Sequence, residues 1–252
     1  MAHKPLSRAG IIALAVLFAT ADSLAVEQDR TRSETVVLLH GLSRTPRSMS
    51  KLARALSAEG YRVVNVGYPA NSHPIDVLAD YLDGQIRQHC KGSGQRVHFV
   101  THSMGGIVLR YYLDTRQCPD LGRVVMLGPP SSGSELVDLG RTVPFLRRHL
   151  GPSRGQLGTR PSDLPAQLAP PRYELGIIAG NRSLNPVFSL IIPGEDDGMV
   201  SVERTKAAGM KDFLVVPHSH TFIMRSSEVI RQSIRFLREG IFDHAGAVRE
   251  SS

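Results

Sequence analysis

Short runs of β-branched and apolar residues recur along the chain, and stretches with apolar positions at helical spacing separate them. The runs predict buried strands, which lie at residues 35–39, 61–68, 97–100, 122–128, 174–179 and 212–216. The spaced stretches predict helices at residues 49–56, 75–90 and 221–238, with a fourth beginning after residue 103. Because strand and helix alternate throughout, the sequence predicts an α/β fold with a mostly parallel central sheet flanked by helices.

This alternation breaks between Pro129 and Arg172. Eight of the chain's 16 prolines fall in this stretch, many glycines lie between them, and the apolar residues are scattered rather than periodic. The stretch is too long for an ordinary loop, and long insertions commonly carry function. We therefore expect residues 131–172 to form a cap over the carboxyl edge of the sheet, with one or two short helices.

The first 25 residues have the pattern of a secretory signal peptide. Lys4 and Arg8 form a basic start, an apolar run follows at residues 10–21, and small residues allow cleavage after Ala21 or Ala25. The run is shorter than the roughly 20 residues of an ordinary transmembrane helix, and an uncleaved anchor is the alternative. We expect the chain to be exported, to the periplasm or beyond it, with residues 26–252 forming one domain.

The composition is ordinary for a globular protein, with 41% hydrophobic residues, 21% charged residues and a formal net charge of +7. The basic residues form no run, tryptophan is absent and no nucleic-acid motif occurs, so we expect no nucleic-acid partner. The modest positive charge suits peripheral contact with an anionic lipid surface, and solubility without a specific partner is the alternative. The sequence does not determine the oligomeric state.

One stretch, residues 97–109, combines a predicted strand, a sharp turn and a predicted helix. Ser103 lies at the apex of the turn, with Thr101 before it and Gly105 after it. The positions two residues before and two residues after the serine must be small, because strand and helix come close together there. Thr101 is larger than the alanine or glycine expected at the first of them. The alternative is a helix start capped by Ser103, a role that serine fills well.

Two cysteines, Cys90 and Cys118, flank this strand and helix. In an exported chain an even number of cysteines suggests a bridge. A right-handed crossover brings both to the side of the sheet away from Ser103, so a disulfide is geometrically feasible. Two half-buried thiols are the alternative.

The turn at Ser103 resembles the nucleophile elbow, G-x-S-x-G, of the α/β-hydrolases. The pair His40-Gly41 follows an upstream strand, and an acid and a histidine lie downstream, so the chain resembles bacterial lipases and esterases of that fold. It is similar to small lipases with a His-Ser-Met-Gly-Gly elbow and to hydrolases related to GPI-inositol deacylases. The resemblance implies a serine hydrolase that cleaves carboxylic or lipid esters through an acyl-enzyme, and the predicted signal peptide implies that it is exported. Acyl transfer by the same residues and a catalytically silent binding protein are the alternatives.

This resemblance implies a Ser-His-Asp triad, because a serine hydroxyl is a poor nucleophile until a base takes its proton. Ser103 is the predicted nucleophile, and His220, just after the last predicted strand, is the predicted base. His218 is the second candidate for the base. His102 adjoins the nucleophile, but the sharp turn points it away, so we expect it to pack in the core.

The predicted triad acid is Asp197, which lies in the turn sequence Asp196-Asp197-Gly198. In the resembling lipases a valine follows the acid after two residues, and Val200 stands at that spacing from Asp197 but not from Asp196. Asp196 would then be a supporting carboxylate, a calcium-facing one or a solvated turn residue. Glu135 is a weaker competitor for the acid.

The resemblance also assigns two backbone amides, those of Leu42 and Met104, to the oxyanion hole. Gly41 would let the backbone approach the substrate, His40 would brace this loop, and Gly105 would let the elbow close. The histidines and cysteines lack the spacing of a zinc site, so we expect no metal and no cofactor. Lipases of this kind sometimes hold a structural calcium near the acid loop, but the sequence assigns no ligands to one.

Overall fold

A computed structural model describes residues 34–90, 95–118, 120–148 and 150–245, so the predicted signal peptide lies outside the described residues. These residues form a six-stranded sheet in the order β2-β1-β3-β4-β5-β6, and every neighbouring pair is parallel. The strands are β1 (Thr35–Leu39), β2 (Arg62–Val66), β3 (Val97–His102), β4 (Leu121–Leu127), β5 (Leu175–Gly180) and β6 (Asp212–Val216). The predicted α/β class with a parallel central sheet is confirmed.

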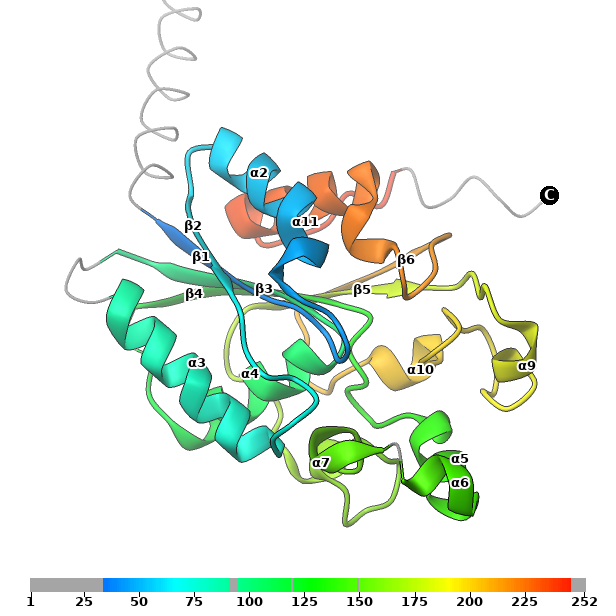
Figure 1. Ribbon diagram of the computed structural model, residues 1–252. Coiled ribbons are helices and arrows are strands. Elements are labelled where there is room, and N and C mark those ends of the chain that lie inside the picture. The colour runs from blue at the N-terminus through cyan, green and yellow to red at the C-terminus, as the bar shows by residue number, and fades with distance from the viewer. Residues whose placement is uncertain (1–33, 91–94, 119, 149, 246–252) are drawn as a thin grey trace, which may run out of the picture.

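Helices cover both faces of this sheet (Figure 1). One face carries α2 (Ser50–Ala58) and α11 (Ser227–Glu239), and the other carries α3 (Ile75–His89) and α4 (Met104–Thr115). The shorter helices are η1 (Pro46–Met49), α5 (Glu135–Thr142), α6 (Pro144–Arg147), α7 (Gly151–Arg154), α8 (Leu164–Gln167), α9 (Pro186–Ser189), α10 (Val202–Thr205) and η2 (Ile223–Arg225). Within the described ranges, none of these helices has the length and apolar character needed to cross a membrane.

Two apolar layers hold the sheet between its helices. Successive residues of β1 point to opposite faces: Val37 and Leu39 pack with α3 and α4, while Val36 and Leu38 pack with α2 and α11. All four side chains are buried. Burial on both faces of a central parallel strand explains why the sequence shows continuous apolar runs instead of alternation.

The closing helix begins later than the sequence predicts. Its apolar periodicity extends back to Ile223, but residues 223–225 form the separate turn η2, and α11 begins at Ser227. Ser226 adopts an extended conformation, and its hydroxyl accepts a hydrogen bond from the Val229 amide. This N-cap sets the start of the helix, because a cap residue has non-helical backbone angles.

The predicted cap, residues 131–172, contains four short helices, α5 to α8, where the sequence predicts one or two. Figure 1 shows α5, α6 and α7 on the α3–α4 side of the sheet, toward the carboxyl ends of the strands. Three of the prolines account for the difference, because each stands in the first turn of a short helix instead of interrupting a loop: Pro144, Pro152 and Pro165 occupy the first or second position of their helices.

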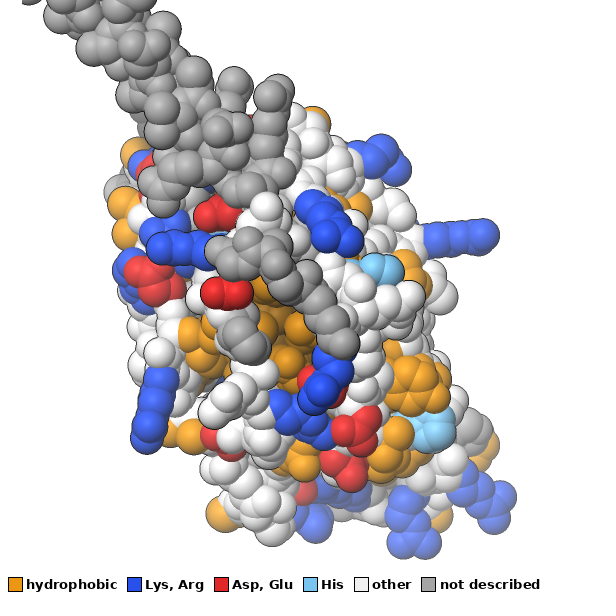
Figure 2. All heavy atoms as spheres, turned by 90° about the vertical axis from the view of Figure 1, so that its left-hand side faces the viewer, with side chains coloured by type: hydrophobic (Ala, Val, Ile, Leu, Met, Phe, Trp, Pro, Cys, Tyr) orange, Lys and Arg blue, Asp and Glu red, His pale blue; other side chains and the backbone are white. Residues whose placement is uncertain are grey.

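Charges of both signs are mixed at the amino-terminal ends of the strands. There Glu174 accepts hydrogen bonds from Arg123 and Lys211, and Arg238 pairs with Glu59. Figure 2 shows this side of the molecule, with basic and acidic side chains interspersed around an apolar area. The net positive charge is therefore not gathered into a single basic patch on this face.

Both cysteines lie within the described residues, and no disulfide joins them. Cys90 is the C-cap of α3 and Cys118 follows α4, and each side chain is half-buried. Burial raises the pKa of both thiols, and together with the neighbouring Cys90 it raises the pKa of Cys118 to about 12. The structure therefore corresponds to the second alternative, two half-buried thiols.

Candidate active site

Ser103 stands between β3 and α4 with a φ of 54° and a ψ of −128°. A positive φ at a residue with a side chain costs about 1–3 kcal/mol and persists only where the surroundings fix it. Here the Ser103 amide donates to the Leu127 carbonyl at 2.9 Å, and the Ser103 carbonyl accepts from the Gly106 amide at 2.9 Å. The hydroxyl does not cap α4, so the helix-cap alternative for this serine is wrong.

The strand and the helix of the elbow come close together because Gly105 and Gly106, in the first turn of α4, have no side chains. A Cβ at Gly105 would lie 2.8 Å from the His40 carbonyl oxygen and 2.9 Å from that of Leu39, both of them backbone atoms. A Cβ at Gly106 would lie 3.3 Å from the hydroxyl of Thr101, which is fully buried. The larger residue at position 101 is therefore accommodated by the missing side chain at position 106.

Three predicted residues from three different loops meet at this turn. Nε2 of His220 lies 2.8 Å from the Ser103 hydroxyl, and Nδ1 of His220 lies 2.7 Å from Oδ2 of Asp197. Ser103 follows β3, Asp197 lies in the loop between α9 and α10, and His220 follows β6. The side chain of Asp197 is completely buried and that of His220 is 9% exposed. Such a chain of contacts can carry a proton from the serine to the histidine while the carboxylate holds the ring.

The loop around Asp197 supports this carboxylate from the other side. Its second oxygen, Oδ1, accepts hydrogen bonds from the amides of Met199 and Val200 at 3.0 and 2.9 Å. The Val200 side chain is buried, as the sequence predicts for a loop anchor. Both oxygens of the carboxylate therefore have partners, which fixes its orientation toward His220.

The two competing candidates lie elsewhere. His218 contacts the hydroxyl of Ser226 at 2.8 Å, so it faces the start of α11 and not Ser103. Glu135 accepts a hydrogen bond from Nε of Arg204 at 2.7 Å. That pair ties the cap to α10, so Glu135 serves the cap and not the predicted base.

The loop after β1 lies against the elbow. A Cβ at Gly41 would be 3.0 Å from the Cβ of Ser103, so only glycine allows this approach. Among the described residues, no hydrogen bond uses the Leu42 amide. The Met104 amide is the first of α4, where amides have no partner within the helix and the dipole is positive. Both predicted oxyanion donors therefore lie on segments that border Ser103.

His40 braces this loop together with a residue that the sequence did not single out. Nδ1 of His40 lies 2.9 Å from the Gly41 carbonyl oxygen, and burial lowers the pKa of His40. The ring stacks on Tyr68 with centroids 4.4 Å apart and planes 13° apart, and the Tyr68 hydroxyl donates to the His40 carbonyl. The available signal was an aromatic residue at the end of the strand that neighbours β1.

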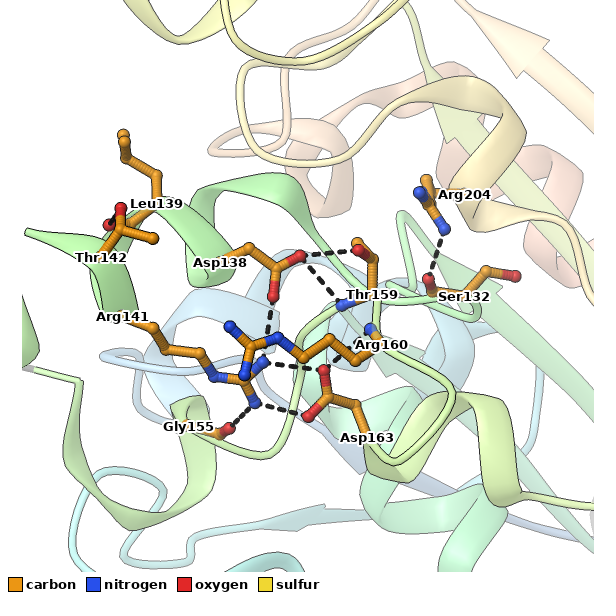
Figure 3. Close-up of polar contacts among 10 residues, drawn as sticks. All are labelled: Ser132, Asp138, Leu139, Arg141, Thr142, Gly155, Thr159, Arg160, Asp163 and Arg204. Carbon is orange, nitrogen blue, oxygen red and sulfur yellow. Dashed lines mark hydrogen bonds and ion pairs between the residues drawn. The ribbon is translucent and has the colours of Figure 1, made fainter.

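Charged side chains hold the cap together internally (Figure 3). The Arg141 guanidinium contacts Asp163 through two nitrogens, at 2.5 and 2.8 Å, and also contacts Asp138 at 3.0 Å. Asp138 in turn accepts hydrogen bonds from the amide and hydroxyl of Thr159. This network joins α5 to the segment before α8 and adds to the apolar contacts of Val137, Leu157 and Leu168, which are buried against the core.

A buried arginine fastens both ends of the cap to the elbow helix. Arg110 of α4 is 6% exposed and donates to the carbonyls of Ser131, Leu168 and Ala169 at 3.0, 3.3 and 3.4 Å. Burial lowers the pKa of this guanidinium. This role is not among the predictions from the sequence, although an arginine within the apolar run of the predicted helix was a signal for it.

Within the described ranges, no group of three or more histidine, cysteine, aspartate or glutamate side chains is arranged to hold a metal ion. In the acid loop, Asp196 accepts hydrogen bonds from the Gly198 amide and the Ser189 hydroxyl. The carboxylates of Asp196 and Asp197 therefore form hydrogen bonds with other groups of the protein.

Comparison with known proteins identifies a family model and several solved structures. The family model described as the alpha/beta hydrolase family matches residues 36–231. No curated protein matches the chain in sequence.

Three of the similar structures are a lipase, a phospholipase and an esterase. Lipase BlEst2 of Bacillus licheniformis in its propeptide form has a TM-score of 0.68 at 19% identity, over 82% of this chain and 50% of that one. Phospholipase PlaB of Legionella pneumophila has a TM-score of 0.63 at 18% identity, over 82% of this chain and 59% of that one. The metagenomic carboxyl esterase MGS0156 has a TM-score of 0.59 at 18% identity, over 77% of this chain and 66% of that one. The chain thus spans half to about three fifths of the first two proteins, and the likeness is one of fold.

Proposed function

Because the chain belongs to the alpha/beta hydrolase family, we propose that it is an exported serine hydrolase that cleaves carboxylic ester bonds. The observation that carries this proposal is the continuous line of contacts from Asp197 through His220 to the hydroxyl of Ser103. Ser103 stands on a strained turn at the end of a central strand, the position that the nucleophile of acyl transfer occupies in this fold.

In the first half of the proposed reaction, the Ser103 oxygen attacks the ester carbonyl and its proton passes to Nε2 of His220. The Asp197 carboxylate stabilises the imidazolium that forms, through its contact with Nδ1. The amides of Leu42 and Met104 donate to the developing oxyanion, an interaction worth about 3 kcal/mol for each donor in comparable sites. The imidazolium then protonates the departing alcohol, which leaves an acyl-enzyme on Ser103.

In the second half, His220 takes a proton from water, whose oxygen attacks the acyl-enzyme. The tetrahedral intermediate that forms releases the free acid as its bond to the Ser103 oxygen breaks, and His220 returns the proton to that oxygen. The reaction uses only side chains and backbone amides of the chain, so we propose that it needs no cofactor.

The distribution of exposed apolar side chains favours a lipidic ester as the substrate. Among the described residues, most of the large apolar side chains that are exposed lie on segments that follow the carboxyl ends of β4, β5 and β6. We call this set the apolar rim: Phe145, Leu146, Leu184, Val187, Leu190, Met199 and Phe222. Figure 1 places α6 and α9, which carry part of the rim, at the carboxyl end of the sheet. Leu184, Val187 and Leu190 lie within one short segment, and exposed apolar patches on soluble proteins mark interaction sites.

Basic side chains accompany the apolar rim. Arg147 and Arg148 are exposed at the end of α6, and the Arg225 guanidinium lies 5.9 Å from the ring centroid of Phe222. Apolar side chains flanked by arginines suit peripheral contact with an anionic lipid surface, because the former enter the interface and the latter meet phosphate. We propose such contact as the way in which the site reaches its substrate.

A series of p-nitrophenyl esters of increasing acyl length, with covalent labelling by a fluorophosphonate, tests the proposed function. We expect hydrolysis with a preference for longer chains and labelling at Ser103. Absence of both would indicate the silent binding protein, and formation of a new ester with an added alcohol in place of the acid would indicate an acyltransferase. Mass spectrometry of the mature amino terminus tests export: we expect cleavage after Ala21 or Ala25.

A further inference from the structure

His102 adjoins Ser103 in the chain, and its ring contacts the two other parts of the candidate site. It is the last residue of β3 and is 1% exposed. Its Nε2 lies 3.0 Å from the main-chain carbonyl oxygen of His220, and the two ring centroids are 4.9 Å apart. Gly41 packs against the opposite edge, where a Cβ would lie 2.9 Å from Nδ1 of His102.

These contacts determine the protonation state of the ring. A carbonyl oxygen only accepts hydrogen bonds, so Nε2 of His102 carries the proton and donates it to His220. Burial, reinforced by the neighbouring His220, holds the pKa of His102 well below its ordinary value, so the ring is neutral and Nδ1 is bare. Within the described residues this Nδ1 is a buried atom without a hydrogen-bond partner.

The His220 main chain is held by few contacts of its own. Residues 217–222 belong to neither a helix nor a strand. The His220 amide donates to the Asp197 carbonyl at 2.9 Å, and the His220 carbonyl accepts from His102. The main chain of His220 is therefore fixed at its amide by Asp197, which also orients the imidazole ring, and at its carbonyl by His102.

We propose that His102 is a positioning residue, whose Nε2–H holds the His220 backbone so that the imidazole stays in line with Ser103. The proposal rests on the proposed function. Because His102 is bonded directly to Ser103 in the chain, this hydrogen bond ties the strand of the nucleophile to the loop of the base. It thereby maintains the 2.8 Å contact between the Ser103 hydroxyl and His220. A displacement of about 1 Å in such an arrangement can cost roughly 100-fold in rate.

Two substitutions of nearly equal shape test the hydrogen bond. Gln and Met have similar length and volume, but only the Gln amide can donate to the His220 carbonyl. We expect His102→Gln to keep kcat for a short p-nitrophenyl ester within about threefold of the wild-type value. We expect His102→Met to lower kcat roughly 10- to 100-fold with little change in KM, since the contact acts on catalytic geometry and not on substrate binding.

A buried histidine away from the site serves as the control. His98 lies on the same strand, contacts Glu34, and accepts a hydrogen bond from the Arg123 amide. His98→Met should lower the melting temperature without changing kcat. Equal losses of kcat in His102→Gln and His102→Met, a loss that appears in KM alone, or full activity in His102→Met would each overturn the proposal.

A second measurement does not depend on turnover. In histidine-labelled protein, the Nδ1 proton of His220 should give a protected low-field NMR signal in the wild type and in His102→Gln, because Asp197 and the loop hold it. In His102→Met this proton should exchange faster with water, and unchanged exchange would overturn the proposal. If the wild type hydrolyses no ester and takes up no fluorophosphonate, the proposed function fails, while this exchange experiment still decides the role of His102.

Discussion

Asp196 and Asp197 are adjacent in the chain, yet their carboxylates serve different structures. Oδ2 of Asp197 lies 2.7 Å from Nδ1 of His220, whereas Oδ1 of Asp196 accepts the Gly198 amide at 2.7 Å and closes its own turn. Both side chains are buried, so the alternative that Asp196 is a solvated turn residue is wrong. Its carboxylate shapes the loop that delivers Asp197.

This difference predicts unequal effects of the two amide substitutions. Asp197→Asn should lower kcat by roughly 10⁴, because the amide favours the wrong tautomer of His220. Asp196→Asn should keep most of the activity, because the Asn side-chain oxygen can still accept from Gly198. Steady-state kinetics on a soluble ester measure both, and the reverse order would move the triad acid to Asp196.

Ser103→Ala should abolish fluorophosphonate labelling and lower kcat by about six orders of magnitude, the loss typical of removing the nucleophile from such a triad. Circular dichroism should show an unchanged fold, since the substitution only removes a hydroxyl. Ser233→Ala, at a buried serine on α11, is the matched control and should be labelled like the wild type. Persistent labelling of Ser103→Ala would point to a different serine.

Gly105→Ala should destabilise the protein by several kcal/mol, because its Cβ would press on the carbonyl oxygens of His40 and Leu39, which are backbone atoms. Gly84→Ala is the opposite case. Gly84 lies exposed within α3 with open space around its Cβ position, so alanine there should stabilise by about 0.5–1 kcal/mol. Urea unfolding compares them, and equal effects would mean that the elbow is not tightly closed.

The cap network predicts a pH dependence of stability. Hydrogen bonding to Arg141 holds the pKa of Asp163 below its ordinary value, so its contribution is complete above the unfolded-state pKa of about 3.9 and is lost as the pH falls through the lower folded-state value. Asp163→Asn should therefore cost about 2 kcal/mol at neutral pH, and this difference should shrink in acid.

Urea unfolding at several pH values measures this dependence. Asp80→Asn is the control: Asp80 pairs with Arg116 but its side chain is 67% exposed, so its removal should cost under about 1 kcal/mol at any pH. A constant effect of Asp163→Asn across the acid range would contradict a lowered pKa of Asp163 in the folded protein.

The apolar rim predicts a separation between binding to lipid and chemistry. Val187 and Leu190 are 62% and 87% exposed, so replacing both with serine should leave the fold and the turnover of a soluble ester unchanged. Binding to anionic phospholipid vesicles should weaken roughly 10- to 100-fold, because two apolar side chains no longer enter the interface. Ile241→Ser, at an exposed apolar residue outside the rim, should bind like the wild type. Equal binding by all three proteins would leave the rim without a role at lipid surfaces.

Local pattern was sufficient to predict the sheet and the elbow. Strands buried on both faces must be apolar along their length, so their runs are visible in the sequence, and the turn at Ser103 requires small residues at fixed positions. The choice of Asp197 over Asp196 came from the resemblance to lipases in which a valine follows the acid after two residues, a spacing that Val200 has from Asp197. Where a cap residue set an element's start, as Ser226 does for α11, periodicity alone placed the boundary too early.

The sequence by itself thus determined the α/β class, the order of its elements and the candidates for the site. The tertiary structure decided which histidine meets Ser103, the role of His102, the bracing by Tyr68 and the attachment of the cap by Arg110. These features depend on contacts between residues far apart in the chain, such as the 117 positions that separate Ser103 from His220. Periodicity records only which face of an element is buried; it carries no information on which polar groups meet when parallel strands bring distant loops to one edge.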